Sequence, residues 1–352
     1  MVRIGMLHHV ENPRRVTKSY AFAAVAKAEG AEFIYFTLRG VDMTRRQVNG
    51  YIYEDGDWHK TTVNLPDVVY NTGSPQKFAR RRRTFAELKQ EIPFTTSALG
   101  KKMSVYNRLL SAGEFIPYLI PSEPLQSSQH LFSYMKQYDQ VIVKPVNGHR
   151  GIGVIYIEKS NNMFHLLSGL ENYDFTAEQL NLYISTRLNE NKLLIQPYIH
   201  CKTKSGNVFD FRLHVQKNGA GEWVNTAIYP RIGAPGSIVS NIFVGGSTNM
   251  LEPFLEQEFG NASTSIKQFL EAFALRLANH LDILQYQLFA EKLDEIGIDV
   301  GLDKNGKYWL FEVNWRPGCP PDFDLKLDVV KNMIHYAMYL ARIKDVTQNT
   351  GN

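Results

Sequence analysis

The sequence predicts an α/β protein with some α+β character, and three observations support this fold class. The chain has 352 residues, of which 44% are hydrophobic and 21% charged, as is typical of folded soluble proteins. At roughly 150 residues per domain, this length predicts about two to three domains. Short apolar runs alternate with a helical pattern near the N-terminus, and paired runs around Asp-Gly or Asn-Gly turns follow.

The first 75 residues are predicted to form a small α/β domain. A strand, a helix and a second strand follow one another, which implies parallel pairing of the two strands. The alanine-rich helix ends at Gly30, a residue common at helix ends. The expected elements are a strand over 2–7, a helix over 19–29, a strand over 32–36, a hairpin over 50–60 and a strand over 67–70.

Three polar residues follow the strands of this domain. Parallel sheets favour ligands at the carboxyl ends of their strands. His8, His9 and Asn71 would lie at that edge. They are therefore candidate substrate contacts, although an ordinary loop role is the simpler interpretation of the two histidines.

The remainder of the chain mixes helices with antiparallel hairpins. Turn signals at Lys217-Asn-Gly and Asp303-Lys-Asn-Gly predict two of these hairpins. The expected elements are a helix over 102–112 ending at Gly113, an extended connector over 116–121, strands over 140–145, 153–158 and 192–199, a helix over 176–189, a hairpin of 209–216 with 222–229, a helix over 265–281, a hairpin over 297–313 and a helix over 326–344.

Composition argues against membrane and secreted proteins. The longest apolar run, 20–26, is far shorter than the roughly 20 residues that span a bilayer. The segment 1–5 is expected to enter a strand rather than a signal peptide. Two cysteines, Cys201 and Cys319, cannot build a disulfide framework, which indicates a reducing cytoplasm.

The net charge of +4 is too small to indicate a nucleic-acid partner, but the charge is unevenly distributed. Nine Lys/Arg face only two Glu between Lys77 and Arg108, including four consecutive arginines, Arg80–Arg83. A nucleic-acid patch is one interpretation. A solvated helix face after Pro75 is the simpler one, because four adjacent helical positions point around most of the helix.

A lysine on a strand precedes a glycine-rich turn at Lys144-Pro-Val-Asn-Gly148-His-Arg-Gly151-Ile-Gly153. Glycines let backbone N–H groups approach phosphate oxygens, and a lysine ammonium neutralises phosphate charge. No Gly-Lys-Ser/Thr follows, and a strand rather than a helix comes next, so neither a P-loop nor a dinucleotide fingerprint is present. Taken alone, a plain hairpin with a glycine loop would look similar.

Two carboxylates and an amide lie on the arms of the last predicted hairpin. Glu312 and Asn314 are two residues apart in a strand and share one face, and the turn brings Asp299 opposite them. Hard oxygen ligands of this kind suit Mg²⁺. Their apolar neighbours argue against a surface role, because paired acids there need a cation to neutralise them.

The order of the motifs resembles the ATP-grasp superfamily. Seven motifs follow one another along the chain. They are a lysine at a helix start, Lys-Pro with a glycine loop, Gln196-x-x-Ile, Asp-x-Arg212, Arg231 followed by Asn and Gly-Gly, a later Asp, and Glu-x-Asn with Pro-Gly. Within this superfamily, Asp210-Phe-Arg-Leu-His-Val and Phe311-Glu-Val-Asn are most similar to YheC/YheD-type proteins, which are described as spore-coat associated. RimK-type amino-acid ligases are a more distant match. The resemblance covers 99–323 most strongly.

This resemblance implies an ATP-grasp fold, in which two α+β subdomains clamp ATP after a small α/β pre-ATP-grasp domain. The implied division is a pre-ATP-grasp domain over 1–75, a basic helical linker over 76–98, an ATP-grasp domain over 99–345 with its lid subdomain at about 125–195, and a tail over 346–352.

The resemblance also assigns nucleotide contacts. Lys102 would be the first phosphate lysine and Lys144 the second, and 148–153 would be a mobile lid loop over the phosphates. Gln196, Tyr198 and Ile199 would form the strand whose backbone contacts adenine. Pro197 replaces a commoner acidic residue and removes a backbone donor, so this contact differs from the usual one.

Arg212 and Arg231 would act on the γ-phosphate and on the phosphoryl group in transfer, and Asn241 would assist at the phosphates. Asp299, Glu312 and Asn314 would hold two Mg²⁺ ions, with Glu312 bridging them; Mn²⁺ is an alternative metal.

The activity implied is an ATP-dependent carboxylate–amine ligase that forms an amide through an acyl phosphate and releases ADP and phosphate. Its partners would be a small-molecule or peptide carboxylate and an amine. The protein would lie in the cytoplasm or be associated with the spore. A homodimer would fit the superfamily. The alternative is a structural coat protein with vestigial catalysis. A third, weaker alternative is another nucleophile, or nucleic-acid binding through the arginines.

Overall fold

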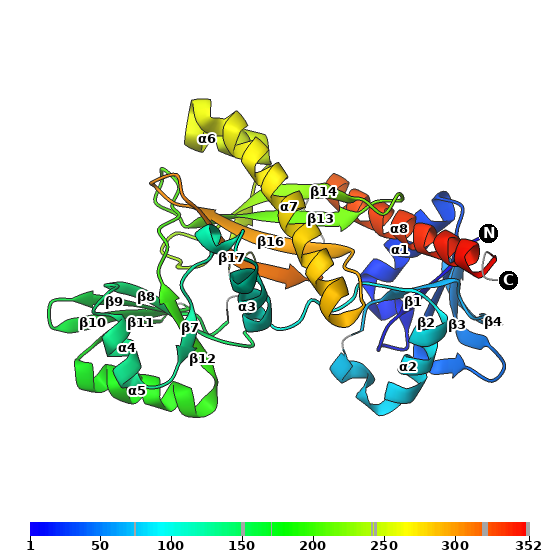
Figure 1. Ribbon diagram of the computed structural model, residues 1–352, viewed down its shortest axis with the longest axis horizontal. Helices are drawn as coiled ribbons and strands as arrows, with labels where there is room; N and C mark the ends of the chain where they lie inside the picture. Colours follow the sequence, from blue (N-terminus) through cyan, green and yellow to red (C-terminus); the bar gives the residue numbers. More distant parts are fainter. Residues whose placement is uncertain are drawn as a thin grey trace.

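The computed structural model describes residues 1–73, 75–148, 152–169, 171–240, 242, 245–318 and 323–349. Three sheets follow one another along the longest axis of the molecule (Figure 1). The N-terminal sheet lies at one end, the lid sheet at the other, and the central sheet between them. Among the described helices, none combines the length and apolar composition needed to cross a bilayer.

The N-terminal sheet has the strand order β4-β3-β2-β1-β5-β6. The predicted parallel pairing is confirmed, because β1 pairs in parallel with β2 and with β5. Strand β2 continues to Asp42, beyond the predicted end at Phe36, since past an irregularity it pairs antiparallel with β3. The elements are β1 (Arg3–Leu7), η1 (Pro13–Arg15), α1 (Thr17–Ala28), β2 (Glu32–Asp42), β3 (Gln47–Glu54), β4 (Asp57–Asn64), β5 (Val68–Asn71), η2 (Pro75–Arg81), α2 (Arg82–Glu91) and β6 (Phe94–Thr95).

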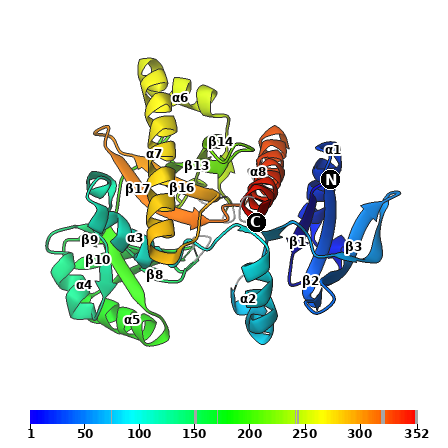
Figure 2. The same cartoon turned by 45° about the vertical axis from the view of Figure 1, so that its right-hand side comes forward.

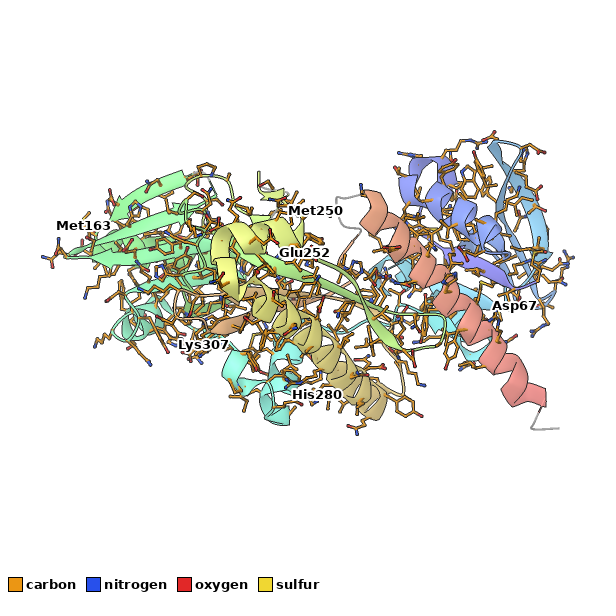
Figure 3. All side chains as sticks on the ribbon, turned by 90° about the horizontal axis from the view of Figure 1, so that it is seen from above. Asp67, Met163, Met250, Glu252, His280 and Lys307 are labelled. Carbon is orange, nitrogen blue, oxygen red and sulfur yellow. The ribbon has the colours of Figure 1, made fainter. Side chains whose placement is uncertain are left out.

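The lid sheet is covered on one side by two helices, α4 and α5, and has the strand order β11-β10-β9-β8-β12-β7. A capping box of Thr176 and Gln179 begins α5, which satisfies backbone N–H groups that have no partner inside the helix. Met163 marks the outer tip of this sheet (Figure 3). The elements are β7 (Glu123–Leu125), α4 (Ser128–Tyr134), β8 (Gln140–Pro145), β9 (Ile155–Ser160), β10 (Met163–Ser168), β11 (Glu171–Phe175), α5 (Ala177–Glu190) and β12 (Leu193–Pro197).

The central sheet has the order β15-β14-β13-β16-β17 and two different faces. Apolar side chains on one face pack against α3, α6 and α7 in the largest core of the molecule. The helix α6 was not predicted, and the expected extended connector after α3 contains a short 3₁₀ helix, η3. The elements are α3 (Lys102–Ala112), η3 (Ile116–Tyr118), β13 (Phe209–Lys217), β14 (Trp223–Ile232), β15 (Ser247–Thr248), α6 (Leu251–Phe259), η5 (Gly260–Ala262), α7 (Ser263–Phe289), β16 (Glu295–Leu302) and β17 (Tyr308–Trp315).

The last helix, α8 (Phe323–Asn349), stands between the central sheet and the N-terminal sheet (Figure 2). Its apolar side chains complete the core of the N-terminal sheet, where Met333, Ile334 and Ala337 join Ile4 and Met6. On its other side it contacts β13 and β14 of the central sheet. The helix therefore joins the first and last parts of the chain, and the domain limits given above stay a prediction.

Candidate nucleotide site

A cavity of about 810 Å³ lies between the lid sheet and the second face of the central sheet. The strands β8 and β12 supply one wall, and β13, β14, β16 and β17 supply the other. Most of the residues that the sequence singled out line this one cavity. They are Lys102, Lys144, Gly148, Gln196, Tyr198, Ile199, Arg212, Arg231, Asp299, Glu312 and Asn314.

Two lysines enter the cavity from different elements. Lys102 is the first residue of α3, and its ammonium donates to the Glu312 carboxylate at 2.8 Å. Lys144 lies on β8, and burial is the main reason that its pKa falls to about 8. The charge of Glu312 opposes this shift and that of Lys102 adds to it. A partly desolvated lysine without a salt bridge in the described structure is ready to receive an anion.

Two arginines on neighbouring strands bind the same carboxylate. Strand register places Arg212 opposite Asp299 and Asp210 opposite Arg231. Arg212 donates to both oxygens of Asp299 at 2.5 and 3.1 Å, and Arg231 donates to Asp210 at 2.7 Å. Arg231 Nη2 also lies 2.9 Å from Asp299. The site is thus a buried network of alternating charges.

Burial and ion pairing act in opposite directions in this network. Burial alone would raise the pKa of Asp299, but the charges of Arg212 and Arg231 outweigh it and lower the pKa. Burial alone would likewise lower the pKa of Arg231, whereas Asp210 and Asp299 hold it well above its ordinary value. Asp299 and Arg231 therefore both stay charged at neutral pH, and each depends on its partners.

The predicted carboxylate hairpin has the expected geometry. Asp299 and Glu312 are direct partners across β16 and β17, and the Asn314 amide donates to Asp299 at 3.2 Å. In the described part of the chain, no three His, Cys, Asp or Glu side chains gather into a metal-binding group. The two carboxylates and the amide nevertheless offer hard oxygen atoms on one face, a donor set that suits Mg²⁺.

The predicted adenine strand runs along the lid side. Gln196 is buried, and its side-chain oxygen accepts from the Ser122 hydroxyl at 3.4 Å. The backbone N–H of Tyr198 already donates to the Gln140 carbonyl at 2.9 Å, and its ring meets Tyr156 edge to face. Burial raises the pKa of Tyr198 to about 12.

Several predicted residues do not join the cavity. Gly153 is described, with φ of 75°, but is not part of the lining. Gly151 and Asn241 lie outside the described residues, as does Cys319.

The candidate substrate contacts of the N-terminal sheet lie apart from the cavity lining. His8 is buried, stacks on His9 at 4.4 Å and accepts from the backbone N–H of Val10. Asn71 ends β5, and its side chain accepts from the Gly73 N–H at 3.2 Å. These residues lie at the carboxyl ends of β1 and β5, as expected.

The four consecutive arginines do not form a helix face. Arg80 and Arg81 belong to η2, while Arg82 and Arg83 begin α2, because the 3₁₀ segment that starts at Pro75 precedes the α-helix. All four are exposed, and Arg83 pairs with Glu87. Their solvation agrees with the simpler interpretation.

Sequence reasoning missed three cavity residues. Asp210 and Tyr229 alternate with the two assigned arginines on their strands, a signal that was available. Arg316 follows the Glu-x-Asn motif directly, and only its position beside that motif could have indicated it.

The described lining of the cavity is strongly positive. It contains six cations and three carboxylates, so the surplus suits a polyanion. The cations are Lys102, Lys144, Arg212, Arg231, Arg316 and Lys326, and the carboxylates are Asp210, Asp299 and Glu312.

Known proteins have similar sequences. The chain is 27% identical over 302 residues to endospore coat-associated protein YheD of Bacillus subtilis (strain 168), covering 82% of this chain and 65% of that protein. It is 21% identical to endospore coat-associated protein YheC of the same organism, over 90% of this chain and 89% of the relative. This chain thus spans slightly less than two thirds of the length of the first relative.

A solved structure has the same fold. D-alanine-D-alanine ligase from Coxiella burnetii superposes with a TM-score of 0.56 at 11% identity, over 99% of each chain. A model of the YheC/D-like ATP-grasp family matches residues 91–340. This match spans the lid sheet, the central sheet and most of α8, which together surround the cavity. The fold predicted from the order of motifs is confirmed, and the chain belongs to the YheC/D-like ATP-grasp family.

Proposed function

We propose that this protein is an ATP-dependent carboxylate–amine ligase that forms an amide bond through an acyl phosphate. The observation that carries this proposal is the positive cavity, in which Lys102, Lys144, Arg212 and Arg231 converge beside a carboxylate hairpin. Such a set neutralises a triphosphate and leaves few groups for covalent catalysis. The activity is therefore positioning and charge stabilisation rather than nucleophilic attack by a side chain.

The lysines and the arginines bind different parts of the nucleotide. Lys144 and Lys102 lie at the wall shared by β8 and α3, where they bind the inner phosphates. Arg212 and Arg231 lie deeper, against the central sheet, where they bind the terminal phosphoryl group and stabilise charge as it spreads during transfer. The strand of Gln196, Tyr198 and Ile199 borders the base.

Asp299, Glu312 and Asn314 would hold Mg²⁺ when nucleotide binds, with Glu312 between two ions. Bound Mg²⁺ supplies neutralisation of phosphate charge. Both oxygens of Asp299 accept from arginines in this structure, so these donors shift toward the phosphates as the nucleotide arrives. Lys102 likewise moves from Glu312 to a phosphate oxygen.

In the reaction, a substrate carboxylate oxygen attacks the γ-phosphorus, and the bond to the β-phosphate oxygen breaks. This yields ADP and an acyl phosphate. An amine then attacks the acyl carbon, phosphate leaves with the C–O bonding electrons, and the amine loses a proton. The cavity walls exclude water, which would otherwise hydrolyse the acyl phosphate.

A second candidate function is a structural role in the spore coat, with vestigial catalysis. The names of the two Bacillus relatives support it, and they also support a location at the spore. The complete set of charged cavity residues favours catalysis, because buried ion pairs are often no more stable than apolar residues of the same size and are then kept for another reason, here ligand binding.

The experiment measures ADP and phosphate release with panels of carboxylates and amines, followed by mass analysis for the amide. Lys144→Ala should weaken ATP binding more than tenfold, since one charge-assisted contact is worth about 1.5–3 kcal/mol. Lys159→Ala, on the exposed end of the neighbouring strand β9, is the matched control and should bind ATP normally. ATP binding without turnover by any pair would favour the structural role, and unchanged binding by Lys144→Ala would remove this lysine from the site.

A further inference from the structure

Arg316 differs from most other cations of the cavity. Lys102, Arg212 and Arg231 each bind a carboxylate within 4 Å. The Arg316 guanidinium has no carboxylate within that distance in the described structure, although it lines the same cavity. Burial lowers the pKa of Arg316 and outweighs Glu295 and Asp294, which act on it only from a distance. A half-buried cation with no carboxylate in contact gains from binding an anion.

The guanidinium is held in place by the N-terminal sheet and by a ring. Its Nη2 donates to the backbone carbonyls of Asn71 at 2.5 Å and Gly73 at 3.0 Å, at the carboxyl end of β5. The group also lies over the Trp315 ring, 4.0 Å from the ring centroid. These contacts use one nitrogen, and in the described residues Nη1 has no partner and buried Nε has none either. The guanidinium is thus held in one orientation and still has unused hydrogen-bond donors.

The backbone supports the same interpretation. Arg316 has φ of 56°, a left-handed conformation that costs a non-glycine residue energy and persists only where its surroundings require it. The next residue, Pro317, accepts from Arg212 through its carbonyl at 3.2 Å. The chain therefore turns at Arg316, so that Pro317 contacts Arg212 while the Arg316 side chain points to the N-terminal sheet.

The surroundings on the N-terminal side are also positive. Lys18 and Arg316 place positive charge near His8, and Lys77 does the same for His9. Among the described residues, no carboxylate forms an ion pair with His9, Lys77 or Arg316. This is the edge where parallel sheets bind ligands, and its charge is suited to an anion.

We propose that Arg316 is the centre of an anion site, between the N-terminal sheet and the nucleotide cavity, that holds a substrate carboxylate which does not react. The proposal rests on the proposed ligase function. The carboxylate that reacts must meet the phosphoryl group near Arg212 and Arg231, whereas the Arg316 guanidinium is anchored at the carboxyl end of β5 by Asn71 and Gly73. Because Arg316 and the pair Arg212 and Arg231 are held at different positions, each position is expected to bind its own anion. One of the substrates is therefore a molecule with a second, permanently free carboxylate.

That carboxylate belongs either to a dicarboxylic acid substrate or to an amino acid that supplies the amine. Two series of probes distinguish these sources. The first compares succinate, glutarate and adipate with their monoamides. The second compares glycine, β-alanine and γ-aminobutyrate with their amides. Each compound is titrated by calorimetry into the whole protein saturated with a non-hydrolysable ATP analogue and Mg²⁺.

The expected result is that, in one series, at least one compound with the free carboxylate binds at least tenfold more tightly than its amide. Arg316→Gln should abolish this preference when the variant is saturated with the ATP analogue, and Arg316→Lys should keep part of it. Arg39→Gln, an exposed arginine of the N-terminal sheet that pairs with Glu11, is the matched control and should keep the preference.

Three results would overturn the proposal: no preference for a carboxylate in either series, a preference that persists in Arg316→Gln, or equal loss in Arg39→Gln. A purely structural role of Arg316 would lower the melting temperature of Arg316→Gln and leave the preference unchanged. Failure of the proposed function gives a different result: the wild-type protein then either does not bind the ATP analogue, or binds ATP and releases no phosphate with any carboxylate and amine, whether or not it prefers a carboxylate.

Discussion

The two faces of the central sheet use the same strands for different purposes. Along β13, the residues Phe209, Phe211, Leu213 and Val215 face α7 and enter the main core, while Asp210, Arg212, His214 and Gln216 point to the opposite face. Every residue of β13 is buried, so neither set is a solvated surface. The comparison shows that strict alternation lets one strand supply both the packing energy and the charged site.

The polar face itself has two halves. The half that contains Arg212 opens to the nucleotide cavity, and the other half lies beneath α8. In the covered half, His214 and Gln216 both contact Glu295, at 3.0 and 3.3 Å, and Gln216 also donates to the Val329 carbonyl. Helix α8 therefore covers this half, as a bound ligand would cover the half that opens to the cavity.

The largest expected effect separates chemistry from packing. Glu312→Gln keeps side-chain volume and removes a charge, so the stability of the fold should change little. If Glu312 holds two Mg²⁺ ions, turnover should fall at least about a thousandfold, a loss of several kcal/mol from the transition state. Phosphate release with an active substrate pair measures this. Near wild-type turnover would contradict the metal assignment, and Glu171→Gln on the exposed strand β11 serves as the control.

Arg231 tests whether the polar face also contributes to stability. Arg231→Ala leaves Asp210 buried without its partner, so we expect a loss of about 3–5 kcal/mol in the free energy of unfolding. Turnover should fall roughly a hundredfold or more while the affinity of the folded protein for ATP changes little. Denaturant unfolding and ATP titration check both parts.

Adding Asp210→Asn to Arg231→Ala should recover part of the stability, because the unpaired charge is gone, and none of the turnover. Recovery of turnover as well would show that Arg231 only neutralises Asp210. A loss of ATP binding without a loss of turnover would reverse its proposed role.

On the apolar face, Leu213→Ala should cost about 2–5 kcal/mol, because the side chain is fully buried and the cavity cannot collapse completely. ATP affinity measured below the transition should be unchanged, since Leu213 points away from the cavity. Thermal unfolding and calorimetric titration of the same sample test this. An altered ATP affinity would mean that the two faces are coupled through the strand.

The smallest effect concerns Asp294, the residue before β16, and depends on pH. Burial and then the charge of Glu295 raise the pKa of Asp294 to about 7, while the Thr96 N–H, Lys217 and Arg316 oppose the shift. The folded protein thus holds a proton that the unfolded chain releases near pH 3.8, so stability should decrease as pH rises from about 4 to 7. Asp294→Asn should flatten this slope in melting temperatures. An unchanged slope would place the effect on another group.

Elements with strong signals at both ends were predicted closely from the sequence. The helix α3 begins at Lys102 and ends before Gly113, whose φ of 82° suits glycine, and β8 spans the predicted residues. The missed helix α6 carries Pro253 and is short, which weakens its pattern. Local sequence signals therefore predict helices and strands, but not which of them pair or pack with one another.

The candidate site was predictable only in part. Alternation along the last hairpin was enough to place Glu312 and Asn314 on one face with Asp299. That Asp299 also binds two arginines depends on the order β14-β13-β16, which local sequence does not specify. The position of the Arg316 guanidinium depends on contacts some 245 residues away, at Asn71.

The packing of α8 has a consequence for how this protein is made. Strands β1 and β5 leave the ribosome long before Met333, Ile334 and Ala341, which complete their core. At roughly 5–20 residues per second, the first sheet waits on the order of 15–55 s for its final helix. During that time its apolar face is exposed to the nascent lid and central sheets. Correct assembly on the ribosome therefore requires these later sheets to form their own cores before they can pair with the first.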